Sequence, residues 1–61
     1  MENPKYKEHT IASGEVISLT YPGDHPKKPW NVSCWDTNDE CRWSVNFASE
    51  AEAESEYIRF D

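Results

Sequence analysis

The 61-residue sequence contains no long apolar run, and this absence limits the classes of protein to which the chain can belong. A helix that crosses a bilayer needs about 20 mostly apolar residues, so we expect no membrane span. The first residues, Met-Glu-Asn-Pro-Lys, lack the basic and then apolar segments that mark a secretory signal. The sequence therefore predicts a cytoplasmic protein that does not act at a membrane.

Cysteine is scarce too, since Cys34 and Cys41 are the only two. Cytoplasmic thiols stay reduced, so both are predicted to be small apolar side chains rather than a disulfide. The six residues between them exceed the two to about four that usual zinc sites show. His9 and His25 would each have to arrive from elsewhere to complete a two-Cys, two-His set. We therefore predict no metal and no cofactor.

Apolar residues make up only 36% of the chain, so the aromatic residues, at 13%, must supply most of the buried area. Disordered chains are depleted in aromatic and β-branched residues, so we expect a folded protein. A chain of this length forms one domain, residues 1–61, and its free energy of unfolding is expected to be only a few kcal/mol.

Positive charge is also in short supply, with six Lys and Arg against twelve Asp and Glu. Acids and lysines balance from residue 1 to 33, whereas residues 34–61 carry eight acids and two arginines, hence the whole net charge of −6. An acidic half repels phosphate backbones and attracts basic surfaces. We therefore expect no direct binding of nucleic acid.

Two segments with strand-like patterns, 5–12 and 15–21, flank Ser13-Gly14, a pair suited to a two-residue hairpin turn. Residues 15–21 contain the apolar and polar alternation of a half-buried strand. Residues 5–12 fit less well and are interpreted as an edge strand, since edges often carry lysine, or as a loose segment. Residues 1–5 are predicted to be a flexible tail. The turn predicts two cross-strand pairs, Ile11 with Val16 and Tyr6 with Tyr21.

Residues 22–29 contain three prolines and a glycine, so they are predicted to form a loop. Segments 30–36 and 40–47, which flank Thr37-Asn38, show the strongest alternation. A tight turn there predicts the pairs Asp36–Asp39, Cys34–Cys41, Val32–Trp43 and Trp30–Val45. All the large apolar side chains then share one face except that of Trp35, which points to the other.

Ser49-Glu50-Ala51-Glu52 is a capping box, in which the serine accepts a hydrogen bond from the third helical amide. Alanine and glutamate favour helix, and Ala53, Tyr57 and Phe60 form a stripe that can pack on a sheet. A short strand at 56–60 is the alternative, because this stretch also alternates with period two. The predicted fold is α+β, a small antiparallel sheet of three or four strands with one C-terminal helix packed on one face. The predicted core comprises Leu19, Val32, Trp43, Val45, Phe47, Tyr57 and Phe60.

The sequence offers little for catalysis. A nucleophilic cysteine needs nearby positive charge to hold its thiolate, whereas both cysteines lie in the acidic half. Acid–base chemistry needs carboxylates in a dry pocket, and so short a chain is poorly able to enclose one of about 300 Å³ or more. We therefore predict that the protein is not an enzyme.

Two functions remain. In the first, the protein is a small acidic binding module that docks on a basic surface of a partner protein. Its carboxylates would imitate the phosphates of a nucleic acid held by that partner, as in small phage-borne inhibitors. In the second, the charge only keeps the fold soluble, and the aromatic sheet face mediates self-association, as in a homodimer. The residues predicted to bind a partner are Trp35, Asp36, Asp39, Glu50 and Glu54.

Overall fold

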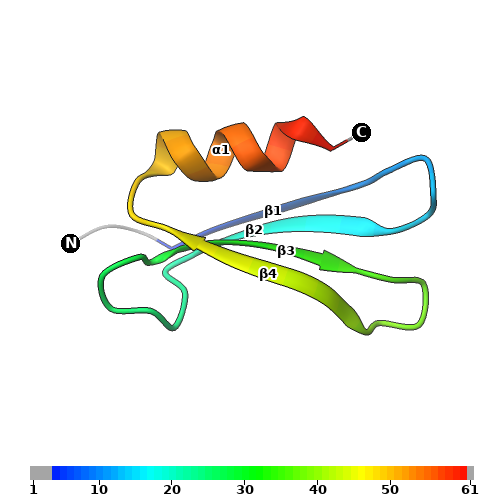
Figure 1. Cartoon of the computed structure of the whole chain (residues 1–61), viewed down its shortest axis with the longest axis horizontal. Helices are drawn as coiled ribbons and strands as arrows, with labels where there is room; N and C mark the ends of the chain where they lie inside the picture. The colour runs from blue at the N-terminus through cyan, green and yellow to red at the C-terminus, as the bar shows by residue number, and fades with distance from the viewer. Residues whose placement is uncertain (1–3, 61) are drawn as a thin grey trace.

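The computed structural model describes residues 4–60 and shows a four-stranded antiparallel sheet with one helix packed on one face (Figure 1). The strands are β1 (Lys5–Thr10), β2 (Val16–Tyr21), β3 (Trp30–Trp35) and β4 (Cys41–Phe47), and they neighbour one another in chain order. The helix α1 (Glu50–Arg59) follows β4. The predicted α+β fold is confirmed, and the alternative strand at 56–60 is wrong. No helix within residues 4–60 is long and apolar enough to cross a membrane.

Two hairpins close with three-residue loops of the same geometry. Ile11 N donates to Glu15 O and Gly14 N donates to Ile11 O, both at 2.9 Å; Asp36 N donates to Glu40 O at 2.9 Å and Asp39 N donates to Asp36 O at 3.1 Å. The last residue of each loop has a positive φ, +92° at Gly14 and +64° at Asp39. Glycine and aspartate tolerate this left-handed conformation better than most residues do. The predicted two-residue turns are therefore wrong.

The three-residue loop shifts the register of β1 by one residue. Tyr6 lies opposite Thr20, so both predicted pairs are wrong, Ile11 with Val16 and Tyr6 with Tyr21. A shift by one residue exchanges the two faces of a strand. Tyr6 and Glu8 therefore point away from α1.

The side of β1 nearest to α1 carries two lysines that form ion pairs with glutamates of the helix. Lys5 Nζ lies 3.1 Å from Glu50 Oε2, and Lys7 Nζ lies 2.6 Å from Glu54 Oε1. Lys5 also lies in strand β1, opposite Tyr21 of β2. The predicted flexible tail of residues 1–5 is therefore wrong at Lys5, while residues 1–3 lie outside the described residues.

In the β3–β4 hairpin the observed register differs from the predicted one by two residues, so each side chain keeps its predicted face. The observed pairs are Trp30–Phe47, Val32–Val45, Cys34–Trp43 and, beyond a β-bulge, Trp35–Cys41. All four predicted pairs are thus wrong in register. Cys34 and Cys41 do not face each other; both are free thiols, the first buried and the second exposed.

The core lies between α1 and the two central strands. Its buried apolar side chains are Ile17, Leu19, Trp30, Val32, Cys34, Ala53 and Tyr57, which confirms the predictions for Leu19, Val32 and Tyr57. Three predicted core residues are only partly buried, namely Trp43, Phe47 and Phe60. Val45 is 40% exposed, so its prediction is wrong. The reason is that β4 is an edge strand, with a neighbouring strand on one side only.

The helix starts at the predicted capping box. Ser49 Oγ accepts a hydrogen bond from Glu52 N at 3.3 Å and donates one to Glu52 Oε1 at 3.0 Å. Ala53 and Tyr57 form the buried stripe, and Arg59 lies in the last turn, where the helix dipole favours a cation. The helix covers one face of the sheet and leaves the other face for solvent or a partner.

Candidate partner-binding face

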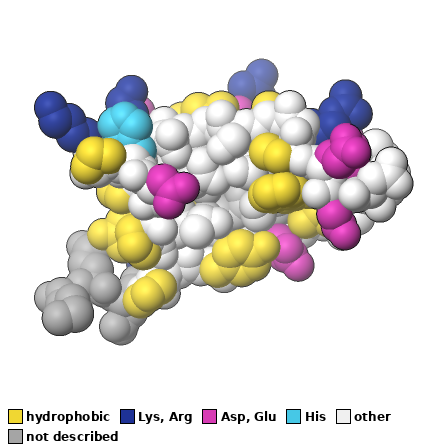
Figure 2. Space-filling view, turned by 90° about the horizontal axis from the view of Figure 1, so that it is seen from below, with side chains coloured by type: hydrophobic (Ala, Val, Ile, Leu, Met, Phe, Trp, Pro, Cys, Tyr) yellow, Lys and Arg dark blue, Asp and Glu magenta, His cyan; other side chains and the backbone are white. Residues whose placement is uncertain are grey.

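The face of the sheet away from α1 is covered by no helix or strand of the described chain, and it is called the open face below. The alternation of side chains and the observed pairings place twelve residues on it: Tyr6, Glu8, Thr10, Val16, Ser18, Thr20, Asn31, Ser33, Trp35, Cys41, Ser44 and Asn46. In Figure 2, which views the molecule from this side, uncharged polar groups fill the middle and acidic groups lie mostly toward the right-hand end. The open face is therefore polar at its centre and acidic at one end.

Polar side chains at the centre of the open face form hydrogen bonds with one another. Asn31 Nδ2 donates to Ser44 Oγ at 2.7 Å and to Asn46 Oδ1 at 2.9 Å. Ser33 Oγ donates to Asn31 Oδ1 at 2.6 Å. These bonds hold the four side chains in one arrangement.

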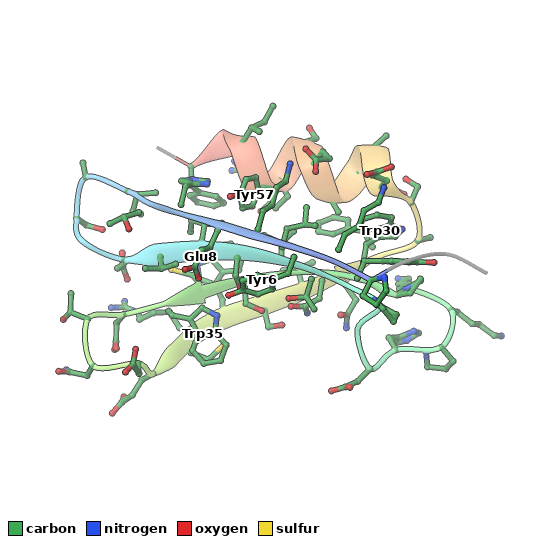
Figure 3. The ribbon with its side chains drawn as sticks, turned by 180° about the vertical axis from the view of Figure 1, so that it is seen from behind. Tyr6, Glu8, Trp30, Trp35 and Tyr57 are labelled. Atoms are coloured by element: carbon green, nitrogen blue, oxygen red, sulfur yellow. The ribbon has the colours of Figure 1, made fainter. Side chains whose placement is uncertain are left out.

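Trp35 lies at one end of the open face, beside a hollow of about 320 Å³. The hollow, called the Trp35 hollow, is lined by Tyr6, Glu8, Val16, Trp35, Asp36 and Asp39. Figure 3 shows Tyr6 and Trp35 on one side of the sheet and Tyr57 and Trp30 on the other. Trp35 Nε1 donates to Ser18 Oγ at 3.1 Å, which holds the ring while 38% of the residue stays exposed. Tyr6 is 64% exposed, so two aromatic side chains offer apolar surface at one place.

Three carboxylates line the Trp35 hollow, and no lysine or arginine does. Glu8 Oε2 accepts a hydrogen bond from the Tyr6 hydroxyl at 2.8 Å, and this bond, together with burial and the charge of Glu8, raises the pKa of Tyr6 above its ordinary value. Asp36 Oδ1 accepts from two backbone amides of its turn, at 2.8 and 3.0 Å. Glu8, Asp36 and Asp39 form no ion pair with any residue from 4 to 60. Aromatic surface and unpaired negative charge therefore meet in this hollow.

The structure separates the five predicted partner-binding residues into two groups. Trp35, Asp36 and Asp39 line the Trp35 hollow. Glu50 and Glu54 lie on α1, on the other side of the sheet, and form ion pairs with lysines of β1. A single docking surface on one face of the sheet cannot include both groups.

Sequence reasoning missed Tyr6, Glu8 and Val16 as members of the site. The signal that could have found them is Gly14, because a glycine at the last position of a three-residue loop sets a different register from a two-residue turn. That register turns Tyr6 and Glu8 toward Trp35. Local loop geometry thus decides the composition of the site.

A second hollow, of about 330 Å³, lies at the other end of the open face. It is lined by Thr20, Pro22, Gly23, Asp24, Asn31, Ser44 and Asn46. A Cβ at Gly23 would lie 3.2 Å from the Pro29 carbonyl oxygen, so the 22–29 loop packs closely here. The amide of Asn31 is already bonded within the face. This hollow offers hydrogen bonds but neither an aromatic ring nor concentrated charge.

Residues 4–60 contain no cluster of metal ligands, and the pKa of the buried Cys34 thiol is raised rather than lowered. No three His, Cys, Asp or Glu side chains from residues 4–60 gather as metal ligands would. Burial, and then the charge of Glu15, raises the pKa of the Cys34 thiol, which therefore stays protonated near neutral pH. His9 Nε2 lies 2.9 Å from the Phe60 carbonyl oxygen, and His25 Nδ1 accepts from two amides of its own loop at 3.1 and 3.0 Å. Both imidazoles are thus engaged in structural contacts.

No family model, curated protein or solved structure matches this chain. The open face is therefore interpreted from its own chemistry. Its polar centre is held by hydrogen bonds, two aromatic side chains are accessible at one end, and the carboxylates beside them form no ion pair within residues 4–60. These are features of a binding surface.

Proposed function

We propose that the protein is a non-enzymatic binding module that docks a basic surface of a partner protein on the open face, at the Trp35 hollow. One observation carries the proposal: Tyr6 and Trp35 meet the carboxylates of Glu8, Asp36 and Asp39 around a single hollow. Aromatic anchors supply most of the energy of many interfaces, and unpaired carboxylates select a basic partner. The combination fits a lysine or arginine side chain.

The positions of two of this chain's own lysines, over aromatic rings, support that choice of ligand. Lys5 Nζ lies 5.6 Å from the centre of the Trp30 ring, and Lys7 Nζ lies 5.0 Å from that of Tyr57. Each of these cations also pairs with a helix carboxylate. A cation placed over an exposed aromatic ring gains about 0.5–1 kcal/mol. The Trp35 hollow presents the same two kinds of group without a cation between them.

The distribution of ion pairs favours the open face over the helix. The carboxylates of Glu50 and Glu54 are already neutralised by lysines, so a partner would have to displace those lysines. Glu8, Asp36 and Asp39 form no ion pair with a residue of the described chain, so a partner would displace no lysine or arginine from them. The net charge of −6 adds long-range attraction for a basic partner.

A partner that holds nucleic acid on the same basic surface suits this chemistry. Carboxylates and phosphates both bind arginine through paired hydrogen bonds, so they compete for the same side chains. The module would then act as an inhibitor of nucleic-acid binding. The expected signature has two parts. The wild-type module captures proteins that the variant Glu8→Gln, Asp36→Asn, Asp39→Asn does not capture. Duplex DNA or RNA then displaces the wild-type module from those proteins.

The first experiment uses an arginine-rich peptide as the probe and amide NMR to locate its contact. We expect the largest shift changes at Tyr6, Glu8, Val16, the Trp35 indole N–H and the turn at 36–39. Binding should weaken as salt rises, because exposed charge pairs are screened over about 8–10 Å near physiological ionic strength. Shift changes confined to α1 would overturn the proposal.

The second experiment neutralises charge without changing shape. Glu8→Gln, Asp36→Asn and Asp39→Asn together remove three charges and keep hydrogen-bond acceptors in place, and asparagine tolerates the positive φ of residue 39. The matched control, Glu50→Gln with Glu52→Gln and Glu54→Gln, removes three charges from α1. We expect the open-face set to weaken peptide binding by about tenfold or more, equivalent to about 1.4 kcal/mol, and the helix set to weaken it much less. Equal losses would show that only net charge matters and would contradict docking at the hollow.

A further inference from the structure

The two edges of the sheet differ in how they are protected from other strands. The β1 edge carries Lys5, Lys7 and Glu8, and its lysines are held against α1. Charged side chains, lysine above all, keep an edge strand from pairing with another chain. The β4 edge contains neither an acidic residue nor a proline, and its one charged side chain, Arg42, forms an ion pair with Glu15 at 3.5 Å. The β4 edge is thus the less protected one.

The apolar side chains of β4 are incompletely covered on the side of α1. Val45 is 40% exposed, while Trp43 and Phe47 are partly buried against the core. The helix packs on β2, β3 and β4, but the outer edge of β4 has no neighbouring strand in the described chain. A further strand beside β4 would extend the core across this edge.

We propose that a second copy of this chain adds to the sheet at β4, antiparallel to β4 of the first. Antiparallel pairing of one edge with itself is self-complementary and generates a closed two-fold dimer. Two chains of net charge −6 repel each other, and this repulsion is smallest at β4, which contains no acidic residue, whereas β1 contains Glu8. With the two-fold axis near Ser44, Trp43 faces Val45 of the second copy, and aromatic with β-branched pairs stabilise antiparallel sheets.

The dimer would be one eight-stranded sheet. A two-fold axis perpendicular to the sheet keeps both helices on one face, so both Trp35 hollows would lie on the opposite, continuous face. The inference does not depend on the proposed function, although a bivalent face would raise the avidity for an extended basic partner. The two ideas predict opposite responses to salt. Screening weakens the docking of a basic partner but relieves repulsion between two acidic copies.

The test measures the mass of the protein in solution and uses two variants to locate the contact. Sedimentation equilibrium of the wild-type protein should show a concentration-dependent species of twice the 7.1 kDa chain mass, unchanged or strengthened by added salt. Val45→Lys puts a charge into the edge and should give a monomer, whereas Ile58→Lys, at a 70% exposed site on α1, should leave the dimer intact. A wild-type protein that stays monomeric at all concentrations, or a folded Val45→Lys dimer, would overturn the proposal.

A measurement on the wild-type chain alone covers the case in which Val45→Lys does not fold. Amide hydrogen exchange at low and high protein concentration should show added protection in β4 and none in β1. Concentration-dependent protection in β1, or on the open face, would instead contradict pairing at β4 and favour association through another surface.

Discussion

Trp35 and Ser18 lie on neighbouring strands of the open face, and the indole Nε1 donates a hydrogen bond to the serine Oγ at 3.1 Å. Ser18 is 3% exposed, whereas Trp35 is 38% exposed. A buried hydroxyl therefore holds an accessible aromatic ring in one orientation. A ring that is already held loses less freedom when a partner packs against it.

This contact predicts a coupling between two substitutions. Ser18→Ala removes the acceptor and Trp35→Phe removes the donor, so each should lower the free energy of unfolding by about 0.5–1.5 kcal/mol through the lost hydrogen bond. In a double-mutant cycle followed by urea denaturation, the combined loss should be smaller than the sum of the single losses. Ser55→Ala, at an exposed position of α1, is the control for serine removal. Strictly additive losses would show that the bond does not stabilise the fold.

The two three-residue loops predict opposite effects of glycine and alanine. A left-handed conformation costs a side chain with a Cβ about 1–2 kcal/mol, so Gly14→Ala should destabilise the protein by about that amount. A Cβ at Gly14 would lie 3.4 Å from Thr37 Cγ2, an ordinary contact, so backbone conformation alone should account for the loss. Asp39→Gly should be neutral or stabilising, and Asp39→Ala destabilising. Urea midpoints of the three variants measure this, and a stable Gly14→Ala protein would contradict the loop geometry.

The position of the core predicts which apolar truncations unfold the protein. Leu19 is 2% exposed, so Leu19→Ala should cost about 2–5 kcal/mol. That loss is comparable to the whole stability of a domain of this size, and the far-ultraviolet circular dichroism of the variant should be that of a largely unfolded chain. Val45→Ala, at a 40% exposed site, should cost only about 0.5–1 kcal/mol. The reverse order of losses would place the core under β4.

The faces of the strands could be predicted from sequence only where a hydrophobic pattern determined them. In β3 and β4 the predicted pairs were wrong, yet Val32 and Trp43 still share a face, because a shift by two residues preserves alternation. In β1 the sequence from Lys5 to Thr10 has no apolar face, so nothing within the strand fixes its register. The loop at Gly14 fixes it instead.

The candidate site was predictable to the extent that it is local in sequence. Trp35, Asp36 and Asp39 adjoin one turn, so any register of the hairpin keeps them together. Tyr6 joins them through two strand pairings, each of which had to be known first. Glu50 was predicted to bind a partner, and the sequence did not reveal its ion pair with Lys5, which is 45 residues away and reaches it only in the folded chain.

The two cysteines should react very differently in the native protein. Cys41 is exposed, whereas Cys34 is buried and its thiol pKa is raised by that burial. Since only the thiolate attacks alkylating reagents, iodoacetamide should label Cys41 in the native protein and Cys34 only after denaturation. Mass spectrometry of the digested protein measures both, and Cys41→Ser should abolish native labelling. Rapid labelling of Cys34 in the native state would contradict its place in the core.

The stability of the fold at alkaline pH should depend on Tyr57. Burial raises the pKa of its hydroxyl, with the nearby Lys7 opposing that shift and Glu54 adding to it. A tyrosine in the unfolded chain ionises near pH 10. The stability due to this shift is therefore complete below about pH 10 and is lost as pH rises through the folded-state pKa, because ionisation then favours unfolding. Tyr57→Phe should fall less steeply than wild type when urea midpoints are compared above pH 10. The ion pairs of Lys5 with Glu50 and of Lys7 with Glu54 can form in both proteins, so parallel curves would contradict the assignment to Tyr57.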